Sequence, residues 1–93
     1  MQDPVTNNDQ SKEDKQKAFW ERARKGVLKF LGDKGGKLPM AQLHDYSMNT
    51  YLIQHQGFSG MMESFVNEGL VEFDWGNSEV TITETGRQFL SQK

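Results

Sequence analysis

The sequence contains no cysteine, which excludes disulfides, cysteine-based zinc sites and thiol chemistry. No apolar run approaches the ~18 residues that a membrane span needs. The first residues also lack the apolar core of a secretory signal. With these features missing, we expect a cytoplasmic protein that has no membrane partner.

Lysine and arginine are absent from residues 38–86. Residues 1–37 hold nine Lys and Arg against six acids, a net charge of +3. Residues 38–93 hold two against seven acids, a net charge of −5. The chain therefore joins a basic first part to an acidic remainder.

The length of 93 residues, of which 34% are hydrophobic, fits one domain with one modest core. Residues 1–10 are polar and aperiodic, so we expect them to form a disordered N-terminal tail. The periodic apolar patterns all follow this stretch, and we expect residues 11–93 to form a single domain.

The first helix is expected to begin at Ser11, a suitable N-cap, and to end at Gly32 and the Gly35–Gly36 pair. Its apolar residues recur with the 3.6-residue period of a helix. They are Phe19, Ala23, Val27, Phe30 and Leu31. A short extended connector over residues 37–39 follows it.

Two more helices are expected before the hairpin. One runs from Met40 to about His55, and the other follows Gly57, with Ser59 as its N-cap. The second of these carries a clear apolar stripe, in which we expect Met61 and Met62 to be core residues. It should end at Gly69 in a Schellman motif.

A hairpin follows, with Gly76-Asn77 as a two-residue type II′ turn. The expected strand pairs are Val71–Ile82, Glu72–Thr81, Phe73–Val80, Asp74–Glu79 and Trp75–Ser78. Trp75 then shares a face with Phe73 at the hairpin tip, where it either closes the core or serves as an exposed anchor for a partner. After the hairpin, Thr83 or Thr85 begins a short helix.

The order of these elements resembles the winged helix-turn-helix superfamily, in the style of small prokaryotic transcription regulators. The resemblance rests on Gly69-Leu70-Val71 after the third helix and on residues 82–87, ITETGR, after the second strand. It covers about residues 15–92. It implies an α+β winged helix with a three-helix core, a two-stranded β-hairpin wing and a short C-terminal helix.

The resemblance further implies a DNA-binding transcription-regulator-like protein, with residues 57–68 as the recognition helix and 75–78 as the wing tip. Four polar side chains are candidates for contacts with DNA: Ser59, Ser64, Asn67 and Asn77. Four cations of the first helix are candidates for phosphate contacts: Arg22, Arg24, Lys25 and Lys29. The competing interpretation of this basic run is a solvated helix face paired with acids such as Glu21.

The expected recognition helix and wing carry no Lys or Arg, although cation–phosphate contacts supply most non-specific DNA affinity. The alternative function is therefore a winged helix repurposed for protein–protein interaction. Its candidate contacts are Trp75, Glu63, Asp74 and Glu79. The first helix is long enough to serve a homodimer, but nothing in it demands one.

Catalysis is not expected, because no nucleophile–base constellation or phosphate-binding loop is present. His44 and His55 stand eleven residues apart with Asp45 beside the first, a spacing that does not indicate a metal site. We therefore expect no cofactor and no metal.

Overall fold

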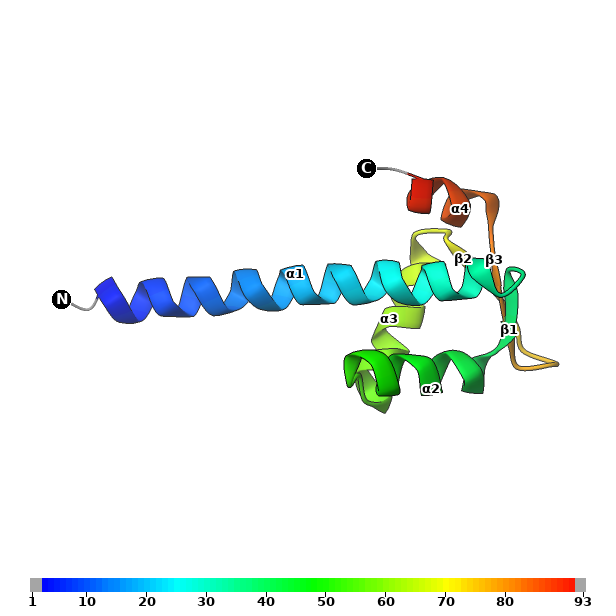
Figure 1. The fold of residues 1–93 in the computed structure, drawn as a ribbon, viewed down its shortest axis with the longest axis horizontal. Helices are drawn as coiled ribbons and strands as arrows, with labels where there is room; N and C mark the ends of the chain where they lie inside the picture. The colour runs from blue at the N-terminus through cyan, green and yellow to red at the C-terminus, as the bar shows by residue number, and fades with distance from the viewer. Residues whose placement is uncertain (1–2, 92–93) are drawn as a thin grey trace.

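The computed structural model describes the backbone of residues 3–91 and the side chains of residues 15–91. This part of the chain is a small α+β domain of four helices and a three-stranded antiparallel sheet. In chain order the elements are α1 (Asp3–Asp33), β1 (Lys37–Pro39), α2 (Met40–Tyr51), α3 (His55–Asn67), β2 (Val71–Asp74), β3 (Glu79–Ile82) and α4 (Glu84–Ser91) (Figure 1). Within the described ranges, no helix has the length and apolar character needed to cross a membrane.

Helix α1 is longer than the sequence predicts, because it begins at Asp3 rather than at Ser11. The backbone of residues 3–10, expected to be a disordered tail, forms its first turns. Pro4 falls in the first helical turn, where its missing N–H leaves no hydrogen bond unmade. Figure 1 shows that this end of α1 extends well beyond the rest of the domain. The glycine-rich end lies where the sequence predicts it, since Gly36 donates a 2.9 Å hydrogen bond to the Leu31 carbonyl.

The hairpin register is confirmed: Val71 pairs with Ile82, and Phe73 with Val80. The turn type is wrong, because Trp75 to Ser78 form a four-residue loop in which Ser78, not Gly76, has a positive φ of 56°. The cause is Asp74, whose carboxylate accepts hydrogen bonds from the backbone and side-chain amides of Asn77. These bonds close the loop without a left-handed glycine.

The connector before α2 becomes a third strand. β1 pairs antiparallel with β3, so the strand order is β1-β3-β2. Two backbone bonds of 2.8 Å extend the pairing at its ends, from Met40 N–H to the Ser78 carbonyl and from Ile82 N–H to the Gly36 carbonyl. β2 is consequently an edge strand of the described sheet, next to α3.

The boundary between α2 and α3 differs from the prediction. α2 ends at Tyr51, with Leu52 in the left-handed conformation, and α3 already begins at His55. Gly57 and Ser59 therefore lie inside α3, and Ser59 is not its N-cap. A Cβ on Gly57 would lie 3.0 Å from Ile53 Cγ2, so this glycine permits close packing instead of breaking the helix.

The two ends that border the hairpin are closed as the sequence predicts. Leu70 N–H donates to the Phe65 carbonyl (2.8 Å) and Gly69 N–H to the Val66 carbonyl (3.0 Å), which is the Schellman pattern. Thr83 caps α4, because its Oγ1 accepts a 3.0 Å hydrogen bond from Gly86 N–H. The same hydroxyl donates to the Gly69 carbonyl (2.6 Å), which ties the start of α4 to the end of α3.

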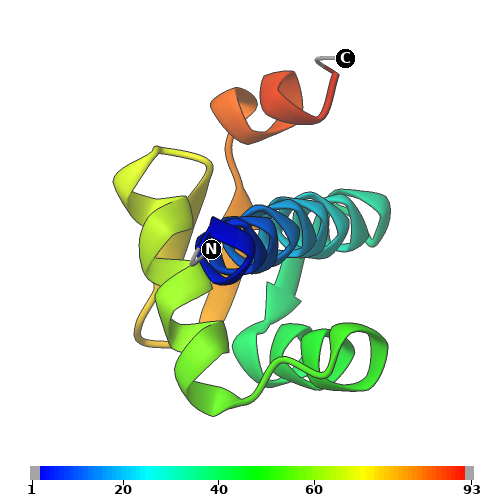
Figure 2. The ribbon, with the colours of Figure 1, turned by 90° about the vertical axis from the view of Figure 1, so that its left-hand side faces the viewer.

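The core lies between α1 and the surrounding elements. Figure 2 looks along α1 and shows α2, α3 and α4 around it with the sheet behind. The fully buried hydrophobic side chains include Ala23, Val27, Leu28, Leu31, Leu43, Met61, Phe65 and Val80. Met61 and Met62 are core residues as predicted, whereas Met48 stays 39% exposed.

Candidate interaction groove

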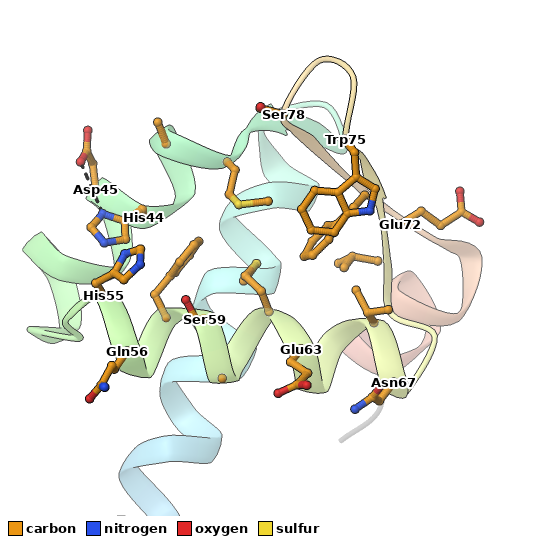
Figure 3. Close-up of a pocket in the computed structure, with 18 of the residues that line it drawn as sticks. His44, Asp45, His55, Gln56, Ser59, Glu63, Asn67, Glu72, Trp75 and Ser78 are labelled. Carbon is orange, nitrogen blue, oxygen red and sulfur yellow. Dashed lines mark ion pairs between the residues drawn. The ribbon is translucent and has the colours of Figure 1, made fainter.

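One face of the domain is hollowed between α2, α3 and β2, and the two ends of the hairpin loop border it (Figure 3). We call this hollow the α3 groove. Its apolar lining includes Met40, Ala41, Phe58, Met62, Val66, Val71, Phe73 and Trp75. Its volume of about 1610 Å³ exceeds the ~300–1,000 Å³ of small-molecule pockets, and it suits a polypeptide segment better.

The groove forms because α3 buries one part of its apolar stripe in the core and leaves another part exposed. Phe58 and Met62 turn inward, with exposed fractions of 3% each, and their outer edges form the floor. Val66, one helical turn after Met62, remains 41% exposed. α3 thus carries its apolar stripe beyond the edge of the core and onto the groove.

Trp75 is exposed rather than buried, which answers the question that the sequence leaves open. Its side chain is 75% exposed, and its ring contacts Phe73 edge-on at a centroid distance of 5.0 Å. Figure 3 shows the indole lying over the groove, between the hairpin and α3. An apolar ring of this size held over an open apolar surface resembles the anchors of protein interfaces.

The charged groups around the α3 groove are all acidic. Asp45, Glu63 and Glu72 belong to its lining and are exposed. Among the described residues, no Lys or Arg lines it. The groove therefore favours a cationic ligand and disfavours an anionic one.

The four polar residues predicted to contact DNA separate into two groups. Ser59 and Asn67 line the groove. Ser64 does not, and its hydroxyl donates a 2.8 Å hydrogen bond back to the Met61 carbonyl. Asn77 lies in the hairpin loop, where its amides bond to Asp74.

The four cations predicted to contact phosphate lie on α1, and Arg24 and Lys29 form ion pairs within the domain. Arg24 is buried, with Nη1 3.2 Å from Glu21 Oε1 and Nη2 2.8 Å from Glu68 Oε1. Lys29 pairs with Asp33 at 2.8 Å, and this hydrogen bond raises the pKa of the lysine. Arg22 and Lys25 are exposed. Figure 3 shows α1 passing behind α3, on the side away from the groove.

Of the four residues predicted to contact a protein partner, the structure brings Trp75 and Glu63 to the groove. Asp74 instead organises the hairpin loop, and its hydrogen bonds from the Asn77 side chain and backbone lower its pKa. Glu79 lies 3.3 Å from Lys37 Nζ of β1, which offsets the like charge of Asp74 opposite it. The sequence could not indicate this pairing while β1 was read as a connector.

The two histidines meet at one end of the groove. Their ring centroids are 5.6 Å apart, and His44 also contacts the Phe58 ring edge-on at 5.0 Å. In the described part of the chain, no cluster of three or more potential metal-ligating side chains occurs. Both histidines line the groove, and His44 Nδ1 lies 3.9 Å from Asp45 Oδ1.

Asp45, Val66 and Glu72 line the groove but are not among the contact residues that the sequence predicts. Val66 carried a usable signal, since the apolar stripe of α3 is wider than one buried face requires. Glu72 lies on the acidic hairpin, which the alternative function already uses through Trp75, Asp74 and Glu79. Asp45 carried no signal, because it comes from α2 and reaches the groove only through the tertiary arrangement.

No family model matches this sequence, no curated protein matches it, and no solved structure matches its fold.

Proposed function

We propose that this domain is a winged helix that binds protein rather than DNA, and that its α3 groove takes a cationic amphipathic segment. The observation that carries the proposal is Trp75, 75% exposed over an apolar groove whose charged lining residues are all acidic. A ligand with apolar side chains would cover this surface, and its Lys or Arg residues would face the acids.

The winged-helix assignment is supported by the element order. Three helices precede a hairpin, a short strand after α1 pairs with that hairpin, and a short helix closes the chain. In a winged helix, α3 would be the recognition helix and the Trp75–Ser78 loop the wing tip. These are the elements that border the groove, so the surface that reads DNA in other winged helices would here face a polypeptide.

The charges support protein over DNA as the ligand. A duplex laid along α3 would bring phosphates towards Glu63 and Glu72, which repel them. The phosphate contacts that could offset this repulsion are reduced by the internal ion pairs of Arg24 and Lys29. Helix α1 also lies behind α3, so its remaining cations do not extend the same surface.

The test is a pair of titrations of the isotope-labelled protein at low salt, followed by backbone amide and indole shifts. One ligand is a synthetic amphipathic helical peptide of leucine and lysine, and the other is a mixed-sequence DNA duplex. We expect the peptide to shift residues 58–67 and the Trp75 indole, and the duplex to leave them unchanged. Salt-sensitive shifts of these residues with the duplex, and none with the peptide, would establish a DNA reader instead.

Two variants make the titration specific. Trp75→Ala should keep the fold, because the ring is exposed, and should weaken peptide binding by about tenfold or more, as truncating a central interface tryptophan does. Glu84→Gln is the matched control, since Glu84 is an exposed acid on α4 outside the groove. Equal affinity for both variants would show that the peptide binds elsewhere.

A further inference from the structure

The ligand of the α3 groove can be sought first in the chain itself. The groove belongs to the acidic part of the sequence, whereas α1 carries most of the cations. A chain's own α1 lies behind α3 and is positioned away from its own groove. The cations of α1 in one copy are therefore available to the acidic groove of another copy.

Helix α1 offers a face that fits the groove. Lys15, Phe19 and Arg22 follow the i, i+4, i+7 spacing that places side chains on one side of a helix. All three are exposed, and Phe19 retains 40% of its surface although it contacts Tyr51. An aromatic side chain flanked by two cations is the counterpart of an apolar floor flanked by acids.

The shape of the molecule makes this face accessible. α1 has 31 residues, about 46 Å at the usual helical rise of 1.5 Å per residue, and the domain measures 56 × 28 × 21 Å. From Lys15 to Phe19 every side chain is exposed, so the helix leaves the body of the domain at this point (Figure 1). It can lie against another molecule without unfolding its own core.

We propose that two copies of this chain form a dimer in which the Lys15–Phe19–Arg22 face of each α1 lies in the α3 groove of the other. Each copy gives its helix to the other and receives the other's helix, so a two-fold axis relates the pair and the arrangement closes as a dimer rather than growing into a filament. Phe19 meets the apolar surface beneath Trp75, while Lys15 and Arg22 face the acids of the partner's groove. This inference rests on the proposed protein-binding function of the groove and names its occupant.

The first experiment is sedimentation velocity of the full chain over a range of concentrations, at low salt and then at high salt. We expect a dimer whose affinity falls as salt screens the ion pairs. Reversing the groove charges with Glu63→Lys and Glu72→Lys, or the helix charges with Lys15→Glu and Arg22→Glu, should weaken the dimer by about tenfold or more, because each change places like charges together. Glu84→Lys and Lys34→Glu are the matched controls and should dimerise like the wild type.

The decisive arm mixes the two reversed proteins. In a reciprocal dimer, the mixed pair has one wild-type contact and one contact with both charges reversed, so both are attractive. We expect the equimolar mixture to recover the dimer that each variant alone has lost. Failure of the mixture to dimerise, with circular dichroism showing both variants folded, would overturn the arrangement.

The outcomes separate this inference from the function on which it rests. If the wild-type protein stays monomeric at all concentrations while the leucine–lysine peptide still shifts the groove residues, the groove binds protein but its occupant is not a second copy. If the peptide also causes no shift, both proposals fail. If both hold, the peptide should compete with α1 and dissociate the dimer.

Discussion

Two glycines in the helices of this domain have very different surroundings. A Cβ on Gly86 would collide with the Leu70 carbonyl oxygen and lie 2.7 Å from Ile82 Cγ1, so α4 packs against the hairpin only because this residue has no side chain. The residue is buried, which leaves no room for a shift. Gly60 in α3 is exposed and has no heavy atom within 4 Å of the same hypothetical Cβ.

Exchanging each of these glycines for alanine should therefore change stability in opposite directions. We expect Gly86→Ala to lower the free energy of unfolding by about 1–3 kcal/mol, the usual cost of overpacking. Gly60→Ala should raise it by about 0.5–1 kcal/mol, because alanine favours the helix. Urea denaturation followed by circular dichroism measures both. A neutral Gly86→Ala would mean that α4 can move away from the hairpin at no cost.

Among the elements, the hairpin loop depends on a single carboxylate. Asp74 accepts hydrogen bonds from the Asn77 side-chain amide (2.9 Å) and backbone amide (3.2 Å), and these bonds lower its pKa. A group whose pKa is lower in the folded state stabilises the fold above its usual pKa. That contribution to stability is lost as the pH falls through the lowered pKa of Asp74.

We therefore expect the Asn77 amide resonances to titrate with a midpoint below the ~3.9 of an unperturbed aspartate. Protonation removes the acceptor charge, so the loop should loosen at more acidic pH while the paired strands persist. Asp74→Asn is the control, in which the Asn77 transition should disappear. A midpoint at or above the usual value would show that the carboxylate does not hold the loop in solution.

Some elements of the fold could be predicted from the sequence, and others could not. The hairpin register and the Schellman ending of α3 were predictable, because each depends on residues a few positions apart in the chain. The loop type was not, because Asp74 replaced the glycine conformation on which the prediction relied. β1 was missed for a different reason: its partner is β3, some forty residues further along.

The groove was predictable only in part, because it too depends on contacts between residues that lie far apart in the chain. Trp75 and Glu63 lie on the two elements that the sequence singles out, and both reach the groove. Asp45 arrives from α2 and reaches the groove only because α2 packs beside α3. The boundary between these two helices was also predicted several residues too late, because Gly57 packs closely inside α3 instead of ending a helix.

At the scale of the whole molecule, Arg24 connects three helices. It projects from α1, lies 2.8 Å from Glu68 at the end of α3, and has its guanidinium over the rings of Phe65 and Phe89, the latter in α4. Its side chain is only 7% exposed, whereas that of Glu68 is 48% exposed. Nη2 is close enough to Glu68 for an ion pair, although the angle does not make a hydrogen bond, and Nε has no hydrogen-bond partner among the described residues.

A buried guanidinium with incomplete hydrogen bonding should depend strongly on its carboxylate partners, Glu21 within α1 and Glu68 across the helices. Glu68→Gln should lower the free energy of unfolding by about 1–2 kcal/mol, less than for a fully buried pair because Glu68 is half exposed. In an Arg24→Met background, which keeps an apolar side chain between the two rings, Glu68→Gln should have almost no effect. A double-mutant cycle by urea denaturation measures this difference. Additive effects would mean that the ion pair contributes nothing and that Arg24 holds the three helices together through packing of its stem alone.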